Sequence, residues 1–308
     1  MLEKIYLVKP RGFCAGVNRA IQTVEKAIAK FGSPIYVRHQ IVHNNYVVKD
    51  LEKKGAIFVD SLDAVPNGSI IIFSAHGIPP TVIEEAKSRN LTTIDATCPL
   101  VTKVHMEAVY FGKKDYQIVL IGHKGHQEVV GTMGYANMTL VENIVDVSKL
   151  SFPENIEKIV YLTQTTLSLD DTVDVIEALK KKYPQIISAP KEDICYASQN
   201  RQAAVKDLSQ YVECILVVGA SNSSNSNRLV ETAKKKGVDA FLIHNLSKIE
   251  SNWFLPYKTI GITSGASVPD ILVDKLIKHI QKTKSNIVIE NLNVIKEDVF
   301  FQLPKELN

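Results

Sequence analysis

Stretches with apolar residues at helical spacing alternate with short apolar runs along most of the chain. After Cys14, the apolar residues recur every three or four positions, at Val17, Ala20, Ile21, Val24, Ala27 and Ile28. This spacing is typical of a helix that buries one face. Phe31-Gly32-Ser33-Pro34 ends the predicted helix, and Ile35-Tyr36-Val37 predicts a buried strand.

The same order of elements returns after two further cysteines. Helical stripes follow Cys98 and Cys195, and the runs Ile118–Ile121 and Ile215–Val218 then predict strands. A second strand is predicted in each unit, followed by a turn of small polar residues and a helix. These second strands lie at 70–73, 159–162 and 259–262, and the helices at 80–88, 169–182 and 269–282. The chain therefore contains a threefold repeat whose units each begin near a cysteine.

Alternating strands and helices predict an α/β fold with mainly parallel sheets. We expect three quasi-equivalent α/β lobes around a pseudo-threefold axis, with ligand groups at the carboxyl ends of the strands. The expected boundaries are 1–97 for the first lobe, including the N-terminal strand, 98–193 for the second and 194–283 for the third. Residues 284–308 are expected to form a tail that packs across the lobes.

Charge and hydropathy exclude several classes of partner. The 308 residues include 36 Lys and Arg against 33 Asp and Glu, a balance that does not favour nucleic acid or an anionic membrane as partner. The apolar runs are far shorter than the roughly 20 residues that span a bilayer. Met1 leads almost directly into an apolar strand with no signal-like segment, so we expect a cytoplasmic protein.

Three of the four cysteines stand just before predicted helices. A thiol at a helix N-terminus lies at the positive end of the dipole, which favours the thiolate that soft metals and iron–sulfur clusters require. Three thiolates leave one iron of a four-iron cluster open to a substrate, whereas a structural zinc would need a fourth ligand. Cys214 lies within a strand pattern and is expected to be a core residue.

The polar turns contribute mostly neutral hydrogen-bonding groups, which would suit an anion held at helix starts and turns. They contain His43-Asn44, His76, Ser223-Ser224-Asn225 and Ser267. Glu128 is the carboxylate of this set, and an anionic cluster and substrate would raise its pKa toward that of a general acid. Thr165 and Thr166 are candidates to relay a proton or hold a substrate hydroxyl. His43 or His76 alone would more often be a surface or core residue, but their matching positions at strand ends favour a site, and the alternative for Glu128 is an ordinary exposed carboxylate.

Longer motifs around these residues resemble the LytB family of 4-hydroxy-3-methylbut-2-enyl diphosphate reductases. The resemblance covers residues from about 5 to about 283, in order. Its cysteine motifs are Arg11-Gly12-Phe13-Cys14-Ala15-Gly16-Val17, Asp95-Ala96-Thr97-Cys98-Pro99 and Ile194-Cys195-Tyr196-Ala197. The polar motifs are Val42-His43-Asn44, Ala75-His76-Gly77, Gly125-His126-Gln127-Glu128, Gln164-Thr165-Thr166, Asn222-Ser223-Ser224-Asn225 and Gly265-Ala266-Ser267. Ser198 departs from the threonine expected there but keeps a hydroxyl.

The resemblance implies an iron–sulfur enzyme that catalyses the last step of the non-mevalonate isoprenoid pathway. It would convert an allylic alcohol diphosphate to isopentenyl and dimethylallyl diphosphate by two-electron reductive dehydroxylation. Cys14, Cys98 and Cys195 would hold one 4Fe–4S cluster whose open iron takes the substrate's hydroxyl oxygen. The diphosphate would be held by His43, His76, Ser223, Ser224, Asn225 and Ser267. His126, Thr165 and Thr166 would position the substrate, and Glu128 would supply protons.

The implied partners are small. Ferredoxin or flavodoxin would donate the electrons, because the chain has no flavin or nicotinamide motif of its own. We expect a monomer or a weak dimer.

Two other functions also agree with the cysteine pattern. One is a dehydratase similar to quinolinate synthase, which uses an open iron as a Lewis acid without net reduction. The other is an iron–sulfur sensor that binds a ligand without turnover. Turnover with a reductant separates the reductase from both.

Overall fold

The computed structural model describes residues 2–153, 156–245, 248–250, 253–284 and 286–307. The chain forms two compact units that are not continuous in sequence. Unit 1 contains Met1–Ala15, His43–Asn45 and Tyr196–Phe300, and unit 2 contains Gly16–Val42, Tyr46–Cys195 and Phe301–Asn308.

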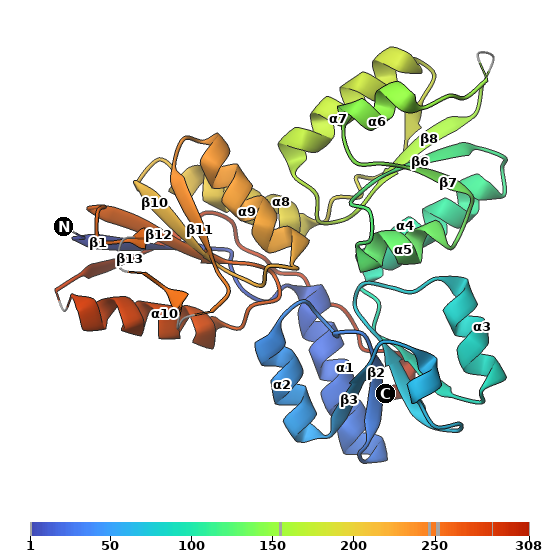
Figure 1. Cartoon of the computed structure of the whole chain (residues 1–308), viewed down its shortest axis with the longest axis horizontal. Helices are drawn as coiled ribbons and strands as arrows, with labels where there is room; N and C mark the ends of the chain where they lie inside the picture. Colours follow the sequence, from blue (N-terminus) through green and yellow to red (C-terminus); the bar gives the residue numbers. More distant parts are fainter. Residues whose placement is uncertain (1, 154–155, 246–247, 251–252, 285, 308) are drawn as a thin grey trace. The chain divides into compact units, whose positions relative to one another are not determined.

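Unit 1 is built on one sheet with helices on both faces (Figure 1). The strands lie in the order β11 (Asp239–Ile243), β10 (Cys214–Val218), β12 (Thr259–Ser264), β1 (Lys4–Lys9) and β13 (Val288–Asn293). Helices α8 (Tyr196–Leu208) and α9 (Ser224–Lys235) cover one face, and α10 (Asp270–Thr283) covers the other.

Unit 2 contains two four-stranded sheets. One has the order β3 (Ala56–Val59), β2 (Ile35–Arg38), β4 (Ile70–Phe73) and β5 (Thr92–Asp95). The other has the order β7 (Met138–Val141), β6 (Gln117–Ile121), β8 (Ile159–Thr163) and β9 (Ile187–Ser188). The helical elements of this unit are α1 (Ala15–Phe31), α2 (Asn45–Lys54), η1 (Leu62–Ala64), α3 (Pro80–Ser88), α4 (Pro99–Gly112), α5 (Gln127–Met133), α6 (Ile144–Lys149), α7 (Leu169–Lys182) and η4 (Lys305–Leu307).

The strand β10 illustrates why its sheet is covered on both faces. Successive side chains of a strand point to opposite faces, so an entirely apolar strand needs two covers. Cys214 and Leu216 pack in the cluster that includes α10, whereas Ile215 and Val217 pack in the cluster that includes α8 and α9. All five residues of β10 are buried.

The three sheets share one connectivity, which confirms the predicted α/β lobes and their parallel strands. The strands β2, β6 and β10 each follow one of the helices that begin after a cysteine. Each lies in its sheet between the next two strands along the chain. These triplets are β3-β2-β4, β7-β6-β8 and β11-β10-β12. Every strand pair that the structure describes is parallel. Parallel strands bring their carboxyl ends to one edge, where the polar turns are found.

The position of β1 differs from the sequence-based expectation. We expected the N-terminal strand in the first lobe, but β1 pairs with β12 of the third sheet, with Ile5 opposite Ile260. The other two sheets have a strand in the same place as β1. β5 pairs with β4 and is followed by Cys98, and β9 pairs with β8 and is followed by Cys195. Each cysteine therefore follows a strand of the preceding sheet, and β1 has this role for Cys14. The numerical lobe boundaries stay a prediction.

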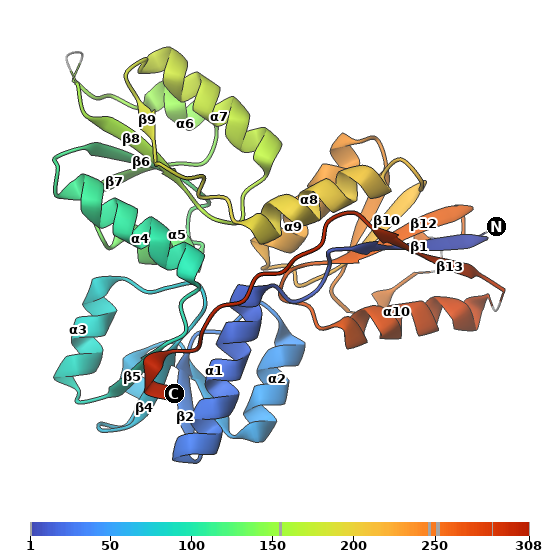
Figure 2. The same ribbon diagram turned by 180° about the vertical axis from the view of Figure 1, so that it is seen from behind.

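The end of the chain adds a strand that the sequence pattern did not resolve. Figure 2 shows β13 beside β1 at the edge of the sheet of unit 1. The following residues up to Phe300 belong to unit 1, and Phe301–Asn308 belong to unit 2. In the described part of the chain, no helix is long and apolar enough to cross a membrane.

The cysteines lie where the sequence placed them relative to helices. Cys14, Cys98 and Cys195 directly precede α1, α4 and α8, and each is half-buried. Cys214 is fully buried in β10, where burial raises the pKa of its thiol to about 12. Cys214 is therefore a core residue that stays protonated at neutral pH.

Candidate active site

The predicted site residues divide between the two units. Unit 2 contains Cys98, Cys195, His76, His126, Glu128, Thr165 and Thr166, whereas unit 1 contains Cys14, His43, Ser223, Ser224, Asn225 and Ser267. In each unit, these residues follow the carboxyl ends of parallel strands or start helices. The group in unit 2 contains the carboxyl group of Glu128, whereas the group in unit 1 consists of a cysteine, a histidine and neutral polar residues.

The centre of the group in unit 2 is a buried carboxyl group bonded to the turn after β8. Glu128 is 3% exposed, and its two oxygens accept from one threonine. Oε1 accepts from the backbone N–H of Thr165 at 2.6 Å, and Oε2 accepts from its hydroxyl at 3.0 Å. These two hydrogen bonds join the carboxyl group, in the first turn of α5, to the turn that follows β8.

Burial raises the pKa of Glu128 to about 7, partly offset by the hydrogen bonds from Thr165, and the charge of Asp193 raises it further. The sequence argument expected a raised pKa from the cluster and substrate charges. In the structure, the largest cause is the loss of water around the carboxyl group. A group with this pKa is available in both protonation states near neutral pH, which suits a general acid.

His126 caps α5 and lies close to His76. The Nδ1 of His126 accepts from the backbone N–H of Glu128 at 3.2 Å, which leaves Nε2 as the protonated nitrogen of the neutral ring. The rings of His76 and His126 meet edge to face with centroids 6.1 Å apart.

Two glycines allow the segments that carry these histidines to approach. A Cβ on Gly131 of α5 would lie 3.2 Å from the carbonyl carbon of Gly77, so the helix packs directly on the turn that follows His76. Gly77 has a φ of +80°, and a Cβ there would lie 2.5 Å from the ring of His105. Gly77 therefore requires glycine, whereas a side chain at Gly131 would be crowded against this turn.

Backbone hydrogen bonds fix the two cysteines of unit 2 relative to these turns. The N–H of Cys98 donates to the carbonyl of Ala75, next to His76, at 3.0 Å. The N–H of Cys195 donates to the carbonyl of Thr165 at 3.0 Å. The same threonine therefore contacts the carboxyl group of Glu128 and the main chain of Cys195.

An ionic group beside Cys195 was not predicted from the sequence. Lys103 on α4 donates to Asp193 at 2.6 Å and lies 3.2 Å from Glu107. The other oxygen of Asp193 accepts from the N–H of Thr163 at 2.9 Å. Asp193 is thereby a structural link between α4, the end of β8 and the segment before Cys195. The Lys103–Glu107 spacing of four residues on a predicted helix was an available signal, but nothing in the sequence connected it to Asp193.

In unit 1, one loop bonds both to Cys14 and to the start of α9. The carbonyl of Ala266 accepts from the N–H of Cys14 at 3.2 Å, and its N–H donates to Oδ1 of Asn225 at 2.9 Å. Ser267, the next residue, donates its hydroxyl to the carbonyl of His43 at 3.1 Å. The loop after β12 therefore joins three of the predicted site segments.

Several polar atoms at this end of the sheet are buried without a partner. They are Nδ2 of Asn225, Oγ1 of Thr263 and Oγ of Ser264. Ser223 caps α9, and its Oγ accepts from the N–H and the hydroxyl of Ser226, which leaves its own hydrogen to donate. Buried polar groups are normally satisfied, so the unpaired amide nitrogen of Asn225 in the first turn of α9 indicates a site for a polar ligand.

The amide side chain of Asn222 lies beside the ring of His43. The side chain of Asn222 lies with Nδ2 3.4 Å from Nδ1 of His43. Ser224 is the first residue of α9, next to the cap. These positions agree with the predicted grouping of His43 with the Ser223-Ser224-Asn225 segment.

The cysteines do not form part of a compact site for a single metal ion in the described ranges. Among the residues that the structure describes, no three His, Cys, Asp or Glu side chains gather closely enough for that. A four-iron cluster makes a different demand, because each thiolate binds a different iron atom. None of the four cysteines forms a disulfide in the described ranges.

Known proteins resemble this chain in sequence and in structure. A family model described as LytB protein matches residues 5–281. A relative from Streptomyces coelicolor is 52% identical over 99% of this chain and 90% of its own, and it is named 4-hydroxy-3-methylbut-2-enyl diphosphate reductase.

Two solved structures are also similar. The E-1-hydroxy-2-methyl-but-2-enyl-4-diphosphate reductase from Plasmodium falciparum is 43% identical with a TM-score of 0.96, and the match covers 100% of this chain and 97% of that one. A second is described as (E)-4-hydroxy-3-methyl-but-2-enyl diphosphate reductase, the terminal enzyme of the non-mevalonate pathway. It is 30% identical with a TM-score of 0.65, over 92% of this chain and 100% of its own.

The family model spans most of the chain, and the relatives match it over nearly their full length. The repeat, the three cysteine-led helices and the polar turns are all within the matched region. The chain belongs to the LytB family.

Proposed function

We propose that this chain is a 4-hydroxy-3-methylbut-2-enyl diphosphate reductase that removes the substrate hydroxyl as water in a two-electron reduction. The products would be isopentenyl and dimethylallyl diphosphate. The observation that carries the proposal is the buried carboxyl group of Glu128, bonded to Thr165, whose carbonyl accepts from the N–H of Cys195. Family membership and the names of the relatives support the same reaction.

We further propose Cys14, Cys98 and Cys195 as ligands of one 4Fe–4S cluster. All three are half-buried thiols directly before helices, where the dipole favours thiolate, and their backbone N–H groups are fixed by carbonyls of the site turns. The residues present therefore fit the donor set of such a cluster. When bound, the cluster would supply electrons one at a time and a Lewis-acidic iron for the substrate oxygen.

Glu128 would provide the proton that lets the hydroxyl leave as water. Thr165 would hold the carboxyl group in place, and the protonated Nε2 of His126 and the ring of His76 would orient the substrate. Two electrons and two protons convert the alcohol to the alkene and water. Ferredoxin or flavodoxin would deliver the electrons, because no nucleotide-binding motif is found in the sequence.

The diphosphate would bind to the neutral donors of unit 1. Asn225 Nδ2 and the hydrogen of Ser223 are available at the start of α9, where the helix dipole also favours an anion. Hydrogen bonds to a charged group contribute more than neutral ones. An anion can therefore be held here without a lysine or arginine cluster.

Replacing Asn225 by Asp is expected to weaken substrate binding by about tenfold to 100-fold, because a charged hydrogen bond is lost and a like charge added. The Oδ1 that accepts from Ala266 N–H is retained, so the loop keeps its anchor. The control is Asn227→Asp, the same change two residues along α9 at a site where the amide donates to Ser221. Calorimetric titration with the substrate under nitrogen measures the effect, and equal affinities for the two variants would remove Asn225 from the site.

The proposed activity is tested by incubating anaerobically purified protein with the diphosphate alcohol and reduced viologen. A reductase oxidises two viologen equivalents per alcohol and yields the dehydroxylated diphosphates, identified by mass spectrometry. A dehydratase or a sensor leaves the viologen reduced. Absence of substrate-dependent oxidation in protein with full iron content would refute the proposal.

A further inference from the structure

A fully buried arginine in unit 1 contacts the segment before Cys14 and the segment after Cys195. Arg201 on α8 is 0% exposed. Its Nη2 donates to the carbonyl of Gly12 at 2.7 Å, and its Nη1 donates to the carbonyl of Ala197 at 3.1 Å. Gly12 lies two residues before Cys14, and Ala197 lies two residues after Cys195.

The counter-ion of Arg201 comes from the C-terminal tail. Glu297 accepts from Nη1 at 3.0 Å through Oε1 and from Nη2 at 3.3 Å through Oε2, in a two-pronged contact. Asn200 also donates to Oε1 at 3.1 Å. A guanidinium buried without a carboxylate would carry the full cost of desolvation, so Glu297 is required for Arg201 to remain in place.

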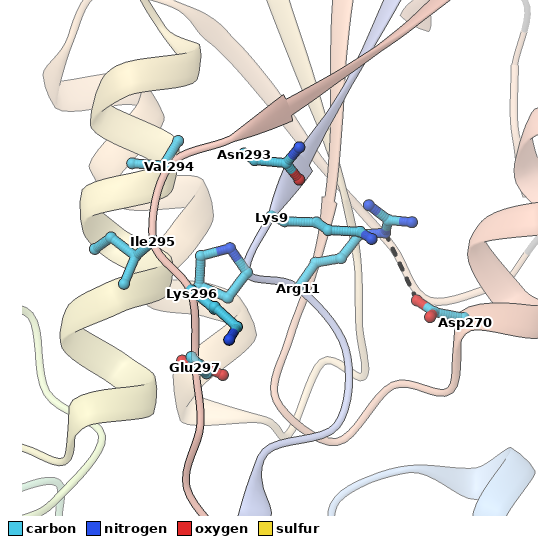
Figure 3. A pocket seen from close by; sticks show the side chains of 9 residues that line it. Lys9, Arg11, Asp270, Asn293, Val294, Ile295, Lys296 and Glu297 are labelled. Atoms are coloured by element: carbon cyan, nitrogen blue, oxygen red, sulfur yellow. Dashed lines mark ion pairs between the residues drawn. The ribbon is translucent and has the colours of Figure 1, made fainter.

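The tail lies beside the segment that leads to Cys14. Figure 3 shows residues 293–297 as one wall of a cavity of about 520 Å³, with Lys9 and Arg11 opposite. On the far side of this cavity, Arg11 is 3.6 Å from Asp270. Glu297 thus lines the same cavity as Lys9 and Arg11, in the segment that leads to Cys14.

Cys14 is fixed from both sides by the same helix. Arg201 bonds to Gly12, and the hydroxyl of Tyr196, the first residue of α8, accepts from the N–H of Ala15 at 3.1 Å. Gly12 has a φ of +73°, and a Cβ there would lie 3.3 Å from the carbonyl oxygen of Val268. This backbone conformation favours glycine, and the Arg201 contact at Gly12 supports the turn together with the bond from the N–H of Cys14 to the carbonyl of Ala266.

We propose that Glu297 in the C-terminal tail is a positioning residue for Cys14, acting through the buried guanidinium of Arg201 on the Gly12 carbonyl. This deepens the proposed function, because Cys14 is one of the proposed cluster ligands. The tail from 294 to 300 would then serve the cysteine site, in addition to covering the core.

The test is the rate at which a thiol reagent modifies Cys14 in the cluster-free protein, measured by peptide mass spectrometry. In Glu297→Gln, the rate at Cys14 is expected to rise by about tenfold or more, because an unpaired buried charge loosens the turn locally. Cys214, in the core of the same unit, is the internal reference, and its rate of modification should not change. Glu297→Asp retains the charge and should restore most of the protection.

The matched control is Asp298→Asn, which makes the same charge change at the neighbouring residue. Asp298 is exposed and paired with Lys296, so Cys14 in its variant should be modified at the same rate as in the natural chain. If Glu297→Gln does not fold, the double change Arg201→Met with Glu297→Leu removes both charges together, which avoids an unpaired buried charge. The Gly12 contact is still lost in that variant, and Cys14 should again label faster.

Two results would overturn the proposal. One is an unchanged labelling rate at Cys14 in the charge-removing variants. The other is a parallel rise at Cys214, which would mean that the whole unit is loosened. Because the measurement uses protein without a cluster, it decides the role of Glu297 even if the chain proves to bind no iron. In cluster-loaded Glu297→Gln, a changed electron paramagnetic resonance signal should accompany the faster labelling.

Discussion

Replacing Glu128 by Gln is expected to lower kcat by about 10²-fold to 10⁴-fold, the usual contribution of a positioned general acid. Gln keeps the shape of the side chain, and its oxygen still accepts from the N–H of Thr165, so the fold should be unchanged. Cluster content and substrate affinity should remain close to those of the natural chain. The measurement is turnover with reduced viologen, beside an iron count and a substrate titration on the same sample.

The control for this variant is Glu142→Gln. Glu142 accepts from the N–H of Lys124 and is an exposed residue at the end of β7, outside the set around Thr165. Its variant should turn over at the natural rate. Normal turnover by Glu128→Gln would show that the proton comes from another source.

The pH dependence of the natural chain follows from the same carboxyl group. Burial raises the pKa of Glu128 to about 7, so the protonated form that acts as an acid is depleted as the pH rises above this value. We expect kcat to fall about tenfold per pH unit on this side of the profile. The anionic cluster and diphosphate would move the falling limb to higher pH. A profile for Glu128→Gln that keeps the same limb would assign it to a different group.

Replacing Cys98 by Ser is expected to abolish both the cluster and turnover. A serine hydroxyl is not ionised at neutral pH and does not replace a soft thiolate. The iron content should fall from about four per chain to well below one after anaerobic purification. The backbone bond from residue 98 to Ala75 is independent of the side chain, so the thermal unfolding of the cluster-free protein should change little.

Cys214→Ser is the matched control for this loss. The sulfur of Cys214 donates to the carbonyl of Trp253 at 3.5 Å, and a serine hydroxyl can do the same. The residue is fully buried in β10, so its variant should keep its iron and its activity. Equal iron loss in the two variants would mean that Cys98 is not a specific ligand.

The order of elements was predictable because it rests on local periodicity. The buried strands β2, β6 and β10 and the helices behind the three cysteines follow from apolar spacing within 20 or so residues. The repeat then predicted three α/β lobes with mainly parallel sheets, which the strand pairing confirms.

The position of β1 was not predictable from local pattern. Its apolar sequence predicts a strand but does not say which sheet it joins. That choice depends on contacts with residues about 250 positions away, such as the pairing of Ile5 with Ile260. The pairing of β13 with β1 is of the same kind.

The residues of the site were predictable because polar residues that follow strands in parallel sheets are candidates for binding and catalysis. Glu128 and Thr165 were named from the sequence, but their bond and the cause of the raised pKa depend on burial. Asp193, Tyr196 and Arg201 were missed as contributors because their roles are contacts to backbone atoms of distant segments. A sequence carries no local pattern for such contacts.

We propose that the three cysteines before α1, α4 and α8 hold an iron–sulfur cluster. The deciding measurement is the absorption spectrum, with the iron and sulfide content, of protein purified without oxygen. A brown protein with about four irons and four sulfides per chain is the expected result. A colourless protein, or one that holds a single zinc ion after the same handling, would contradict the claim.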